Sequence, residues 1–390
     1  MTHRFVLSIV CCATAAFVAG PARAQVPNDI EEGLKKIGQI VDPACTAKLY
    51  RPLMPKNDFN TYWPLGAAAP VSTAQLYPGV TVARDVSFGS DAKDVVDVFA
   101  AEKPGSNRTV FVYVPGGGGN KIEQQVREGN AFYDNIGRWA VKNGMVGVTV
   151  QRHGGAAWDD GGRDLSVAVD WVKANIAKYG GNPNRIVIAA HSAGTGPLGV
   201  YVGHPERWKN GVGVKGAIYM SGNPVPGVGG AGGRGAGGPG AAGGAATPTP
   251  GAACGVGANM GSNDGQIAGP SGQKEAAGFG GGRGGRGFQP PTPEQQKERD
   301  NLPGFKATPV KIMLVRAEWD PGVTGDMAAS DKALHEEMCR LDGDKAKDGV
   351  GHCPAMLFAK QHSHMSEVFA FDTPDTSVSA PILKWIKDLK

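Results

Sequence analysis

Short β-branched runs alternate with amphipathic helical segments over most of this 390-residue chain, and this alternation limits the folds that it can adopt. A helix between two strands returns the chain so that the strands can pair in parallel. Strands are expected at residues 80–88, 94–99, 109–114, 145–150, 186–190, 216–220, 310–315 and 355–359. Helices are expected at residues 30–40, 131–143, 165–176, 328–341 and 377–389, and directly after Ser192. The sequence therefore predicts an α/β fold, a doubly wound and mostly parallel sheet with helices on both faces.

Glycine is concentrated in one segment, residues 222–292, which carries few bulky apolar side chains. Such a segment buries too little area to offset its conformational entropy, so we expect a disordered insertion. Its arginine–glycine repeats also resemble RNA-binding segments, but a linker or surface loop is favoured. The net charge of +4 is spread thinly over the chain, which argues against nucleic acid as a partner.

The first 24 residues are typical of a signal peptide. His3 and Arg4 precede an apolar stretch at 5–20, and Ala22-Arg23-Ala24 provides a cleavage site. The apolar stretch is short for a membrane span, so cleavage after Ala24 is favoured over a retained anchor. We expect a periplasmic or secreted protein without stable membrane insertion, in which residues 25–390 form a single domain interrupted by the insertion at 222–292.

Cleavage would leave four cysteines in a compartment that permits disulfides. Cys339 and Cys353 are close in sequence, and their pairing is favoured over free thiols. Cys254 lies in the glycine-rich segment, so its pairing with Cys45 stays open.

The segment Ala190-His191-Ser192-Ala193-Gly194 follows an expected buried strand and opens a helix. A serine between small residues on such a turn is exposed at the carboxyl edge of the sheet, as a nucleophile must be. The alternative is that Ser192 merely caps the helix.

A serine nucleophile needs a histidine to accept its proton and a carboxylate to orient that histidine. Asp320 follows the strand at 310–315 and is the favoured acid, with Glu318 and Asp326 as alternatives. His362 and His364 follow the strand at 355–359, and one of them should be the base. This pair could instead bind a metal, but it lacks a carboxylate or cysteine at ligand spacing.

A glycine run, 116–119, follows the strand at 109–114, so that backbone N–H groups could bind an oxyanion there. With these motifs the sequence resembles the α/β-hydrolase family, in its carboxylesterase and lipase branch, although Pro115 stands where that branch usually has histidine. The resemblance implies that Ser192 is the nucleophile, Asp320 the acid and His364, rather than His362, the base. It also assigns the oxyanion hole to Gly117, Gly118 and Ala193.

The function expected from these residues is an exported serine hydrolase that cleaves small-molecule carboxylic esters through an acyl-enzyme. This chemistry requires neither metal nor organic cofactor. A peptidase or a lactone or polyester hydrolase could use the same groups, and a non-catalytic binding or adhesion protein could keep the same fold. The sequence leaves the oligomeric state open.

Overall fold

The computed structural model describes residues 26–54, 77–117, 132–153, 157–228, 254 and 292–389. The expected signal peptide, Gly118 and most of the glycine-rich segment lie outside these residues, so what we predict for them stays a prediction. Among the described helices, none is both long enough and apolar enough to cross a membrane.

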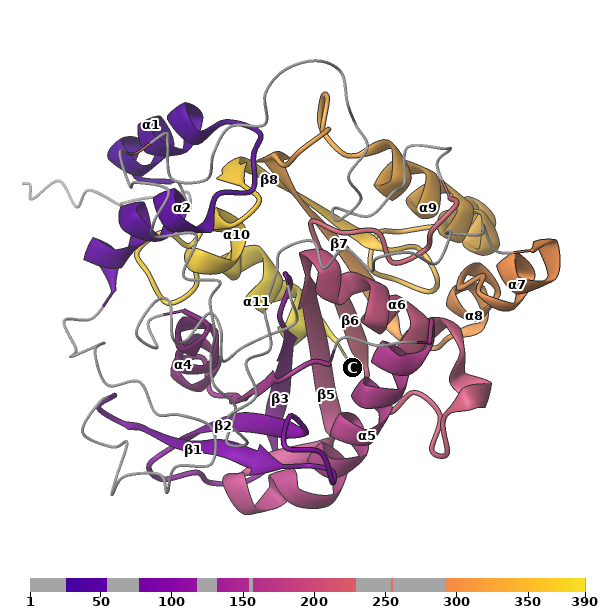
Figure 1. Cartoon of the computed structure of the whole chain (residues 1–390), viewed down its shortest axis with the longest axis horizontal. Coiled ribbons are helices and arrows are strands. Elements are labelled where there is room, and N and C mark those ends of the chain that lie inside the picture. Colours follow the sequence, from indigo (N-terminus) through magenta and orange to yellow (C-terminus); the bar gives the residue numbers. More distant parts are fainter. Residues whose placement is uncertain are drawn as a thin grey trace, which may run out of the picture.

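Eight strands of the described residues form one sheet, in the order β1-β2-β4-β3-β5-β6-β7-β8 (Figure 1). The pairings β1–β2 and β2–β4 are antiparallel, and every other pairing is parallel. The strands are β1 (Val80–Ser87), β2 (Val95–Ala101), β3 (Arg108–Val114), β4 (Val146–Val150), β5 (Gly181–His191), β6 (Gly216–Met220), β7 (Lys311–Trp319) and β8 (Ala355–Ser363). The predicted mostly parallel sheet is confirmed.

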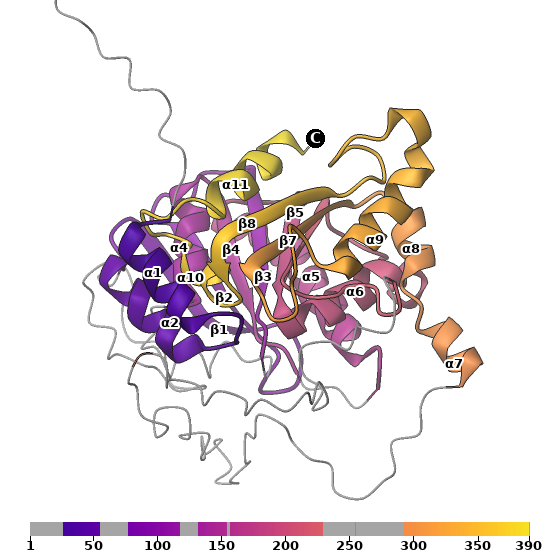
Figure 2. The same cartoon turned by 90° about the horizontal axis from the view of Figure 1, so that it is seen from above.

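Helices cover both faces of the sheet (Figure 2). One face packs against α1 (Asn28–Ile37), α2 (Pro43–Tyr50), α4 (Asp134–Lys142), α10 (Ser366–Phe369) and α11 (Ser379–Asp388). The other face packs against α5 (Asp160–Asn175), α6 (Thr195–Gly203), α8 (Leu302–Ala307) and α9 (Ala329–Cys339), and the short α7 (Pro293–Glu298) is exposed. The predicted doubly wound arrangement is therefore also confirmed.

The central strand β3 shows why these strands are apolar throughout. Its successive side chains point to opposite faces of the sheet. Phe111 and Tyr113 belong to the core under α4, whereas Val110, Val112 and Val114 belong to the core under α5 and α6. A strand covered on both faces has no solvent-facing side, so it carries no alternation of polar and apolar residues.

The amino-terminal segment differs from the prediction in one element. In this segment the sequence predicted one helix, at residues 30–40, but a second helix, α2, begins at Pro43. The Asp42 side chain accepts a hydrogen bond from the Cys45 N–H at 2.9 Å, and Pro43 fits the first turn, where an N–H is not needed. Tyr50, at the end of α2, donates a hydrogen bond to Asp375 at 2.7 Å. This contact ties the segment to the core.

The packed chain extends further into the glycine-rich segment than the predicted boundary at residue 222. Val225 is fully buried in the core under α6. The Asn301 side-chain amide donates to the Pro224 carbonyl at 2.6 Å. The burial of Val225 and the hydrogen bond to the Pro224 carbonyl help to hold residues 222–228 on the protein, which composition alone did not indicate.

Two disulfides join described cysteines. Cys339 pairs with Cys353 across 14 residues, as favoured from the sequence. Cys45 pairs with Cys254 across 209 residues, which the sequence left open. The second bond links α2 to the glycine-rich segment.

Candidate active site

Ser192 lies on the turn between β5 and α6, with a backbone φ of +52°. A positive φ is uncommon for a residue with a side chain and is typical of the strained turn that exposes a nucleophile. The parallel pairing of β3 with β5 brings Val114 beside Ala190, so Gly116, the first residue of the glycine run, lies against Ser192. A Cβ atom on Gly116 would lie 2.8 Å from the Ser192 Cβ, too close for any side chain there.

The structure brings Ser192, His364 and Asp320 together at the carboxyl edge of the sheet. His364 Nε2 lies 2.8 Å from Ser192 Oγ, and His364 Nδ1 lies 2.5 Å from Asp320 Oδ1. The three side chains follow β5, β8 and β7, whose carboxyl ends share one edge because these strands are parallel. With Nδ1–H donating to the carboxylate, Nε2 is free to accept the serine proton.

The second histidine of the pair, His362, has other partners. Its Nδ1 lies 2.9 Å from Ser366 Oγ, and its Nε2 lies 2.6 Å from Ser377 Oγ. The side chain is fully buried, and this burial lowers the pKa of His362. Both ring nitrogens are therefore bound to hydroxyl groups away from Ser192.

The two alternative acids also have other partners. Glu318 accepts a hydrogen bond from the Gln361 N–H at 2.6 Å. Asp326 is exposed and forms an ion pair with Lys332 at 2.5 Å. Among the three carboxylates considered, Asp320 is the one hydrogen-bonded to His364.

Arg316 is a part of the site that sequence reasoning missed. Its Nη1 donates to Asp320 Oδ2 at 2.5 Å, and its Nε donates to Asp331 at 2.7 Å. Burial alone would raise the pKa of Asp320, but the hydrogen bond from His364 and the charge of Arg316 outweigh it and lower that pKa. Asp320 is therefore an anion at neutral pH, with one oxygen on Arg316 and the other on His364.

His191 and Glu367 form a buried pair beneath His364. His191 Nε2 donates to the main-chain carbonyl of His364 at 2.8 Å. Burial lowers the pKa of His191 to about 3, so its ring is neutral. Glu367 lies 3.4 Å from the same nitrogen, and burial raises the pKa of Glu367 well above its usual value. No local motif marks this pair, because its members are separated by most of the second half of the chain.

Two of the three expected oxyanion donors can be located. Gly117 ends the described part of the glycine run, and its carbonyl accepts from Arg152 Nη2 at 3.0 Å. Ala193 lies in the single 3₁₀ turn Ser192–Gly194, which precedes α6. N–H groups at the start of a helix have no partner within that helix. Gly118 lies outside the described residues.

Comparisons with known proteins find esterases that are similar to parts of this chain. The model of the carboxylesterase family matches residues 94–228. Esterase-5B of Drosophila miranda is 34% identical over 116 residues, which are 30% of this chain and 20% of that protein. Esterase LipC of Mycobacterium tuberculosis is 26% identical over 180 residues, 46% of this chain and 44% of that protein. The crystal structure of esterase B from Lactobacillus rhamnosis superposes with a TM-score of 0.51 at 10% identity, over 80% of this chain and 86% of that one.

The chain has the α/β-hydrolase fold, and its residues 94–228 match the carboxylesterase family. The chain spans about a fifth of the length of the Drosophila relative and less than half of LipC. The region matched by the family model contains Ser192 and the glycine run, and it ends before Asp320 and His364. The roles of Asp320 and His364 are therefore inferred from their positions in the structure.

Proposed function

We propose that this α/β-hydrolase is a serine carboxylesterase with Ser192 as nucleophile, His364 as general base and Asp320 as orienting acid. The observation that carries the proposal is the unbroken hydrogen-bonded chain from Ser192 Oγ through both nitrogens of His364 to Asp320. A serine hydroxyl is a weak nucleophile at neutral pH, and such a chain is how proteins activate it.

In the first half of the reaction, Ser192 Oγ attacks the ester carbonyl carbon while its proton passes to His364 Nε2. The resulting imidazolium lies between the tetrahedral intermediate and the Asp320 carboxylate, which stabilises its positive charge. As the intermediate collapses, the C–O bond to the alcohol breaks and His364 returns the proton to the leaving oxygen. The products of this half are a free alcohol and an acyl group on Ser192.

In the second half, His364 takes a proton from water, and the oxygen of that water attacks the acyl carbon. Collapse releases the carboxylic acid and restores the Ser192 hydroxyl. Backbone N–H groups of Gly117, Gly118 and Ala193 would hold the oxyanion in both halves. One such donor typically contributes about 10²–10³-fold to turnover.

We also propose that the enzyme acts outside the cytoplasm on small carboxylic esters. The basic and apolar pattern of residues 1–24 supports export. The two disulfides are consistent with an oxidising compartment. The esterase names of the relatives support an ester as substrate.

The test is hydrolysis of chromogenic esters of increasing acyl length, with a matched amide and a lactone in the same panel. Ser192→Ala is expected to lower kcat by about 10⁴–10⁶-fold. The control is Ser377→Ala, which removes a partly buried hydroxyl bonded to His362 instead of His364. Faster turnover of the amide or the lactone would favour a peptidase or a lactonase. A folded wild-type protein inactive on every substrate would favour a binding protein.

A further inference from the structure

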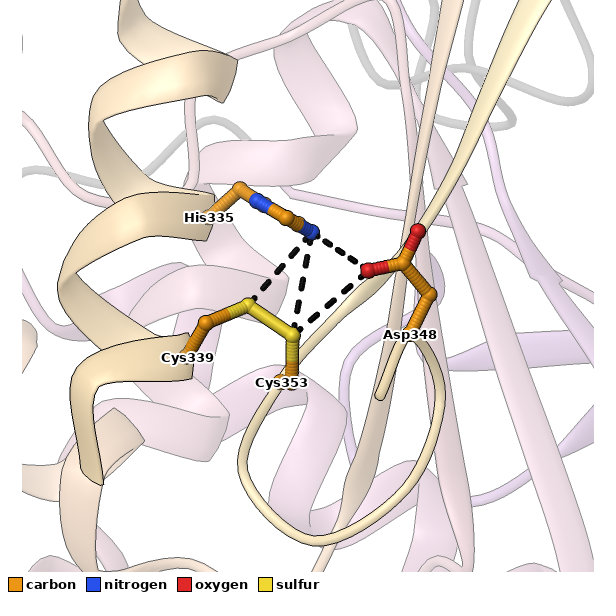
Figure 3. Close-up of side chains that lie close together, drawn as sticks. All are labelled: His335, Cys339, Asp348 and Cys353. Carbon is orange, nitrogen blue, oxygen red and sulfur yellow. Dashed lines mark hydrogen bonds and ion pairs between the residues drawn. A yellow bond between two sulfur atoms is a disulfide. The ribbon is translucent and has the colours of Figure 1, made fainter. Parts of the chain in front are cut away.

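Four side chains far from Ser192 converge on one point (Figure 3). They are His335, Cys339, Asp348 and Cys353, and one donor atom from each lies within 4.8 Å of the others. His335 and Cys339 are four residues apart on α9, which places them on the same face of the helix. Asp348 and Cys353 come from the loop that leads into β8.

The spacing of the donor atoms is close to that of a tetrahedral metal site. His335 Nε2 lies 3.4 Å from Cys339 Sγ, 3.7 Å from Cys353 Sγ and 2.7 Å from Asp348 Oδ1. Cys353 Sγ lies 3.6 Å from the same Asp348 oxygen. Sulfur and nitrogen ligands of one zinc ion are separated by roughly 3.6 Å when the bond lengths are about 2.3 and 2.1 Å. Two separations are shorter than those in a zinc site: His335 Nε2 and Asp348 Oδ1 are at hydrogen-bond distance, and the two sulfur atoms are bonded to each other.

We propose that reduction of the Cys339–Cys353 disulfide converts this cluster into a zinc site, with His335, Asp348 and the two thiolates as ligands. The cluster would then hold α9 and the loop together in either state, by a disulfide under oxidising conditions and by Zn²⁺ under reducing ones.

The conversion needs a reductant and releases protons. A dithiol gives two electrons and two protons to the Cys339–Cys353 bond and is itself oxidised to a disulfide. Zn²⁺ then displaces the two thiol protons into solvent and binds both thiolates. On reoxidation the two thiolates give two electrons to a disulfide oxidant, which takes up two protons and becomes a dithiol, while the Cys339–Cys353 bond forms and the ion leaves.

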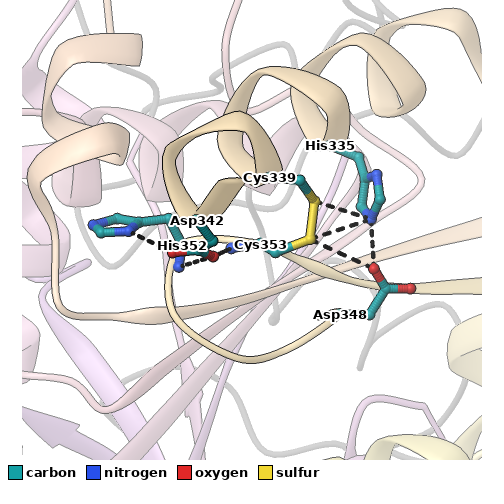
Figure 4. The surroundings of a disulfide bond; sticks show 6 residues. All are labelled: His335, Cys339, Asp342, Asp348, His352 and Cys353. Atoms are coloured by element: carbon teal, nitrogen blue, oxygen red, sulfur yellow. Dashed lines mark hydrogen bonds and ion pairs between the residues drawn. A yellow bond between two sulfur atoms is a disulfide. The ribbon is translucent and has the colours of Figure 1, made fainter. Parts of the chain in front are cut away.

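The loop is held in place by contacts that do not involve the disulfide (Figure 4). The Asp342 carboxylate accepts hydrogen bonds from the N–H groups of His352 and Cys353 at 2.9 and 3.0 Å. A Cβ atom on Gly351 would lie 2.5 Å from Asp342 Oδ1, so a glycine is needed for this approach. Lys311 donates to the Gly351 carbonyl at 2.9 Å, which anchors the loop to β7. After reduction, the two thiols should therefore remain close together.

Exposure and ligand type both suit zinc. The His335 and Asp348 side chains are 22% and 60% exposed, so an ion can reach the cluster from solvent. Thiolate and imidazole ligands select zinc over magnesium or calcium, which prefer oxygen ligands. Two thiolates and one carboxylate would more than neutralise the charge of the ion.

The cluster is independent of the proposed ester chemistry. Cys353 precedes β8, whereas His364 follows it, and β8 is nine residues long. A strand of that length spans roughly 30 Å, so the two sites lie at opposite edges of the sheet. Zinc binding can therefore be tested without an activity assay.

The experiment uses the full-length protein, treated with a phosphine that contains no thiol to compete for metal, and Zn²⁺ titrated against a chromophoric chelator. Reduced wild type is expected to bind one Zn²⁺ per chain, whereas oxidised protein and Cys339→Ser/Cys353→Ser should not bind it above background. His335→Ala and Asp348→Ala should each weaken binding by about tenfold or more. Co²⁺ in place of Zn²⁺ should give the intense absorption of a tetrahedral thiolate complex.

The matched control is His352→Ala, since His352 lies in the same loop with its ring 3.2 Å from Asp342, outside the cluster. This variant should bind Zn²⁺ as wild type does. The proposal is overturned if reduced wild type binds no better than Cys339→Ser/Cys353→Ser, or if His335→Ala binds equally well. Loss of hydrogen-exchange protection over residues 335–353 on reduction would overturn it too, because the ligands would no longer be held together.

Discussion

The two ends of β8 carry two clusters that are assembled in different ways. At the carboxyl end, His364 meets Ser192 and Asp320, which follow two other strands of the sheet. At the amino end, the four proposed ligands all come from residues 335–353, and all but the buried Cys353 are at least partly exposed. The first cluster exists only when the whole sheet is formed, whereas the second depends on one helix and one loop. Substitutions at the first end should therefore affect chemistry most, and those at the second end should affect stability.

The largest expected effect separates His362, near the end of β8, from His364, which follows that strand. His364→Ala should lower kcat/KM for an ester by about 10⁴-fold or more, because Ser192 loses its base. His362→Ala should cost far less, since its ring is bonded to Ser366 and Ser377. Steady-state kinetics on both variants measure the difference. The reverse order of effects would assign the base to His362.

The next effect concerns the carboxylates after β7. Asp320→Asn should lower kcat by about 10³–10⁴-fold, because an amide cannot hold the Nδ1–H of His364 as a carboxylate does. Asp326→Asn is the matched control, because Asp326 is exposed and pairs with Lys332. Equal activity of the two variants would be incompatible with the proposed acid.

A smaller effect is expected at the amino end of β8. Under oxidising conditions, Cys339→Ser/Cys353→Ser should lower the free energy of unfolding by about 3 kcal/mol, the entropic contribution of a loop of this length. Its effect on kcat/KM should be far smaller than that of His364→Ala. Urea unfolding measures the loss of stability, and ester kinetics on the same preparation measure the change in kcat/KM. Severe loss of turnover in a folded variant would show that the two ends are coupled.

The smallest effect is a pH dependence of stability beneath the active site. The pKa of His191 is about 3 in the folded protein, below its ordinary value of 6.5. Between these two values the unfolded chain binds the extra proton, so stability falls as the pH drops from 6.5 towards 3. His191 therefore changes the free energy of unfolding by at most about 1.4 kcal/mol per pH unit.

His191→Asn should remove that slope, as measured by urea unfolding at pH 6.5 and at a pH about one unit lower. The variant keeps a side-chain donor for the His364 carbonyl. An unchanged slope would mean that His191 is not held neutral in the folded protein.

Sequence patterns predicted the parts of the molecule whose residues follow a local periodicity. Each strand and long helix has its own periodicity, and Ser192, Asp320 and His364 each follow a strand, so their order along the chain predicts a shared edge. Arg316 was missed because no local sequence pattern distinguishes an arginine whose side chain binds a carboxylate at the end of its strand from any other arginine. His191 and Glu367 were missed because their contact depends on how α10 packs against β5.

The proposed zinc-binding cluster was predicted only in part. Cys339 and Cys353 were interpreted as a disulfide pair, and that prediction is confirmed. The sequence did not show that His335 and Asp348 point at the same two sulfurs. That convergence depends on a loop held by Asp342, which is a property of the folded backbone.

The most direct test of the proposed catalytic chain is covalent labelling with a fluorophosphonate, followed by peptide mapping. Wild type is expected to carry a single adduct, on Ser192. His364→Ala should label far more slowly, because the hydroxyl then lacks a base. A folded, ester-cleaving protein with no adduct on Ser192, or with its adduct on another residue, would contradict the account.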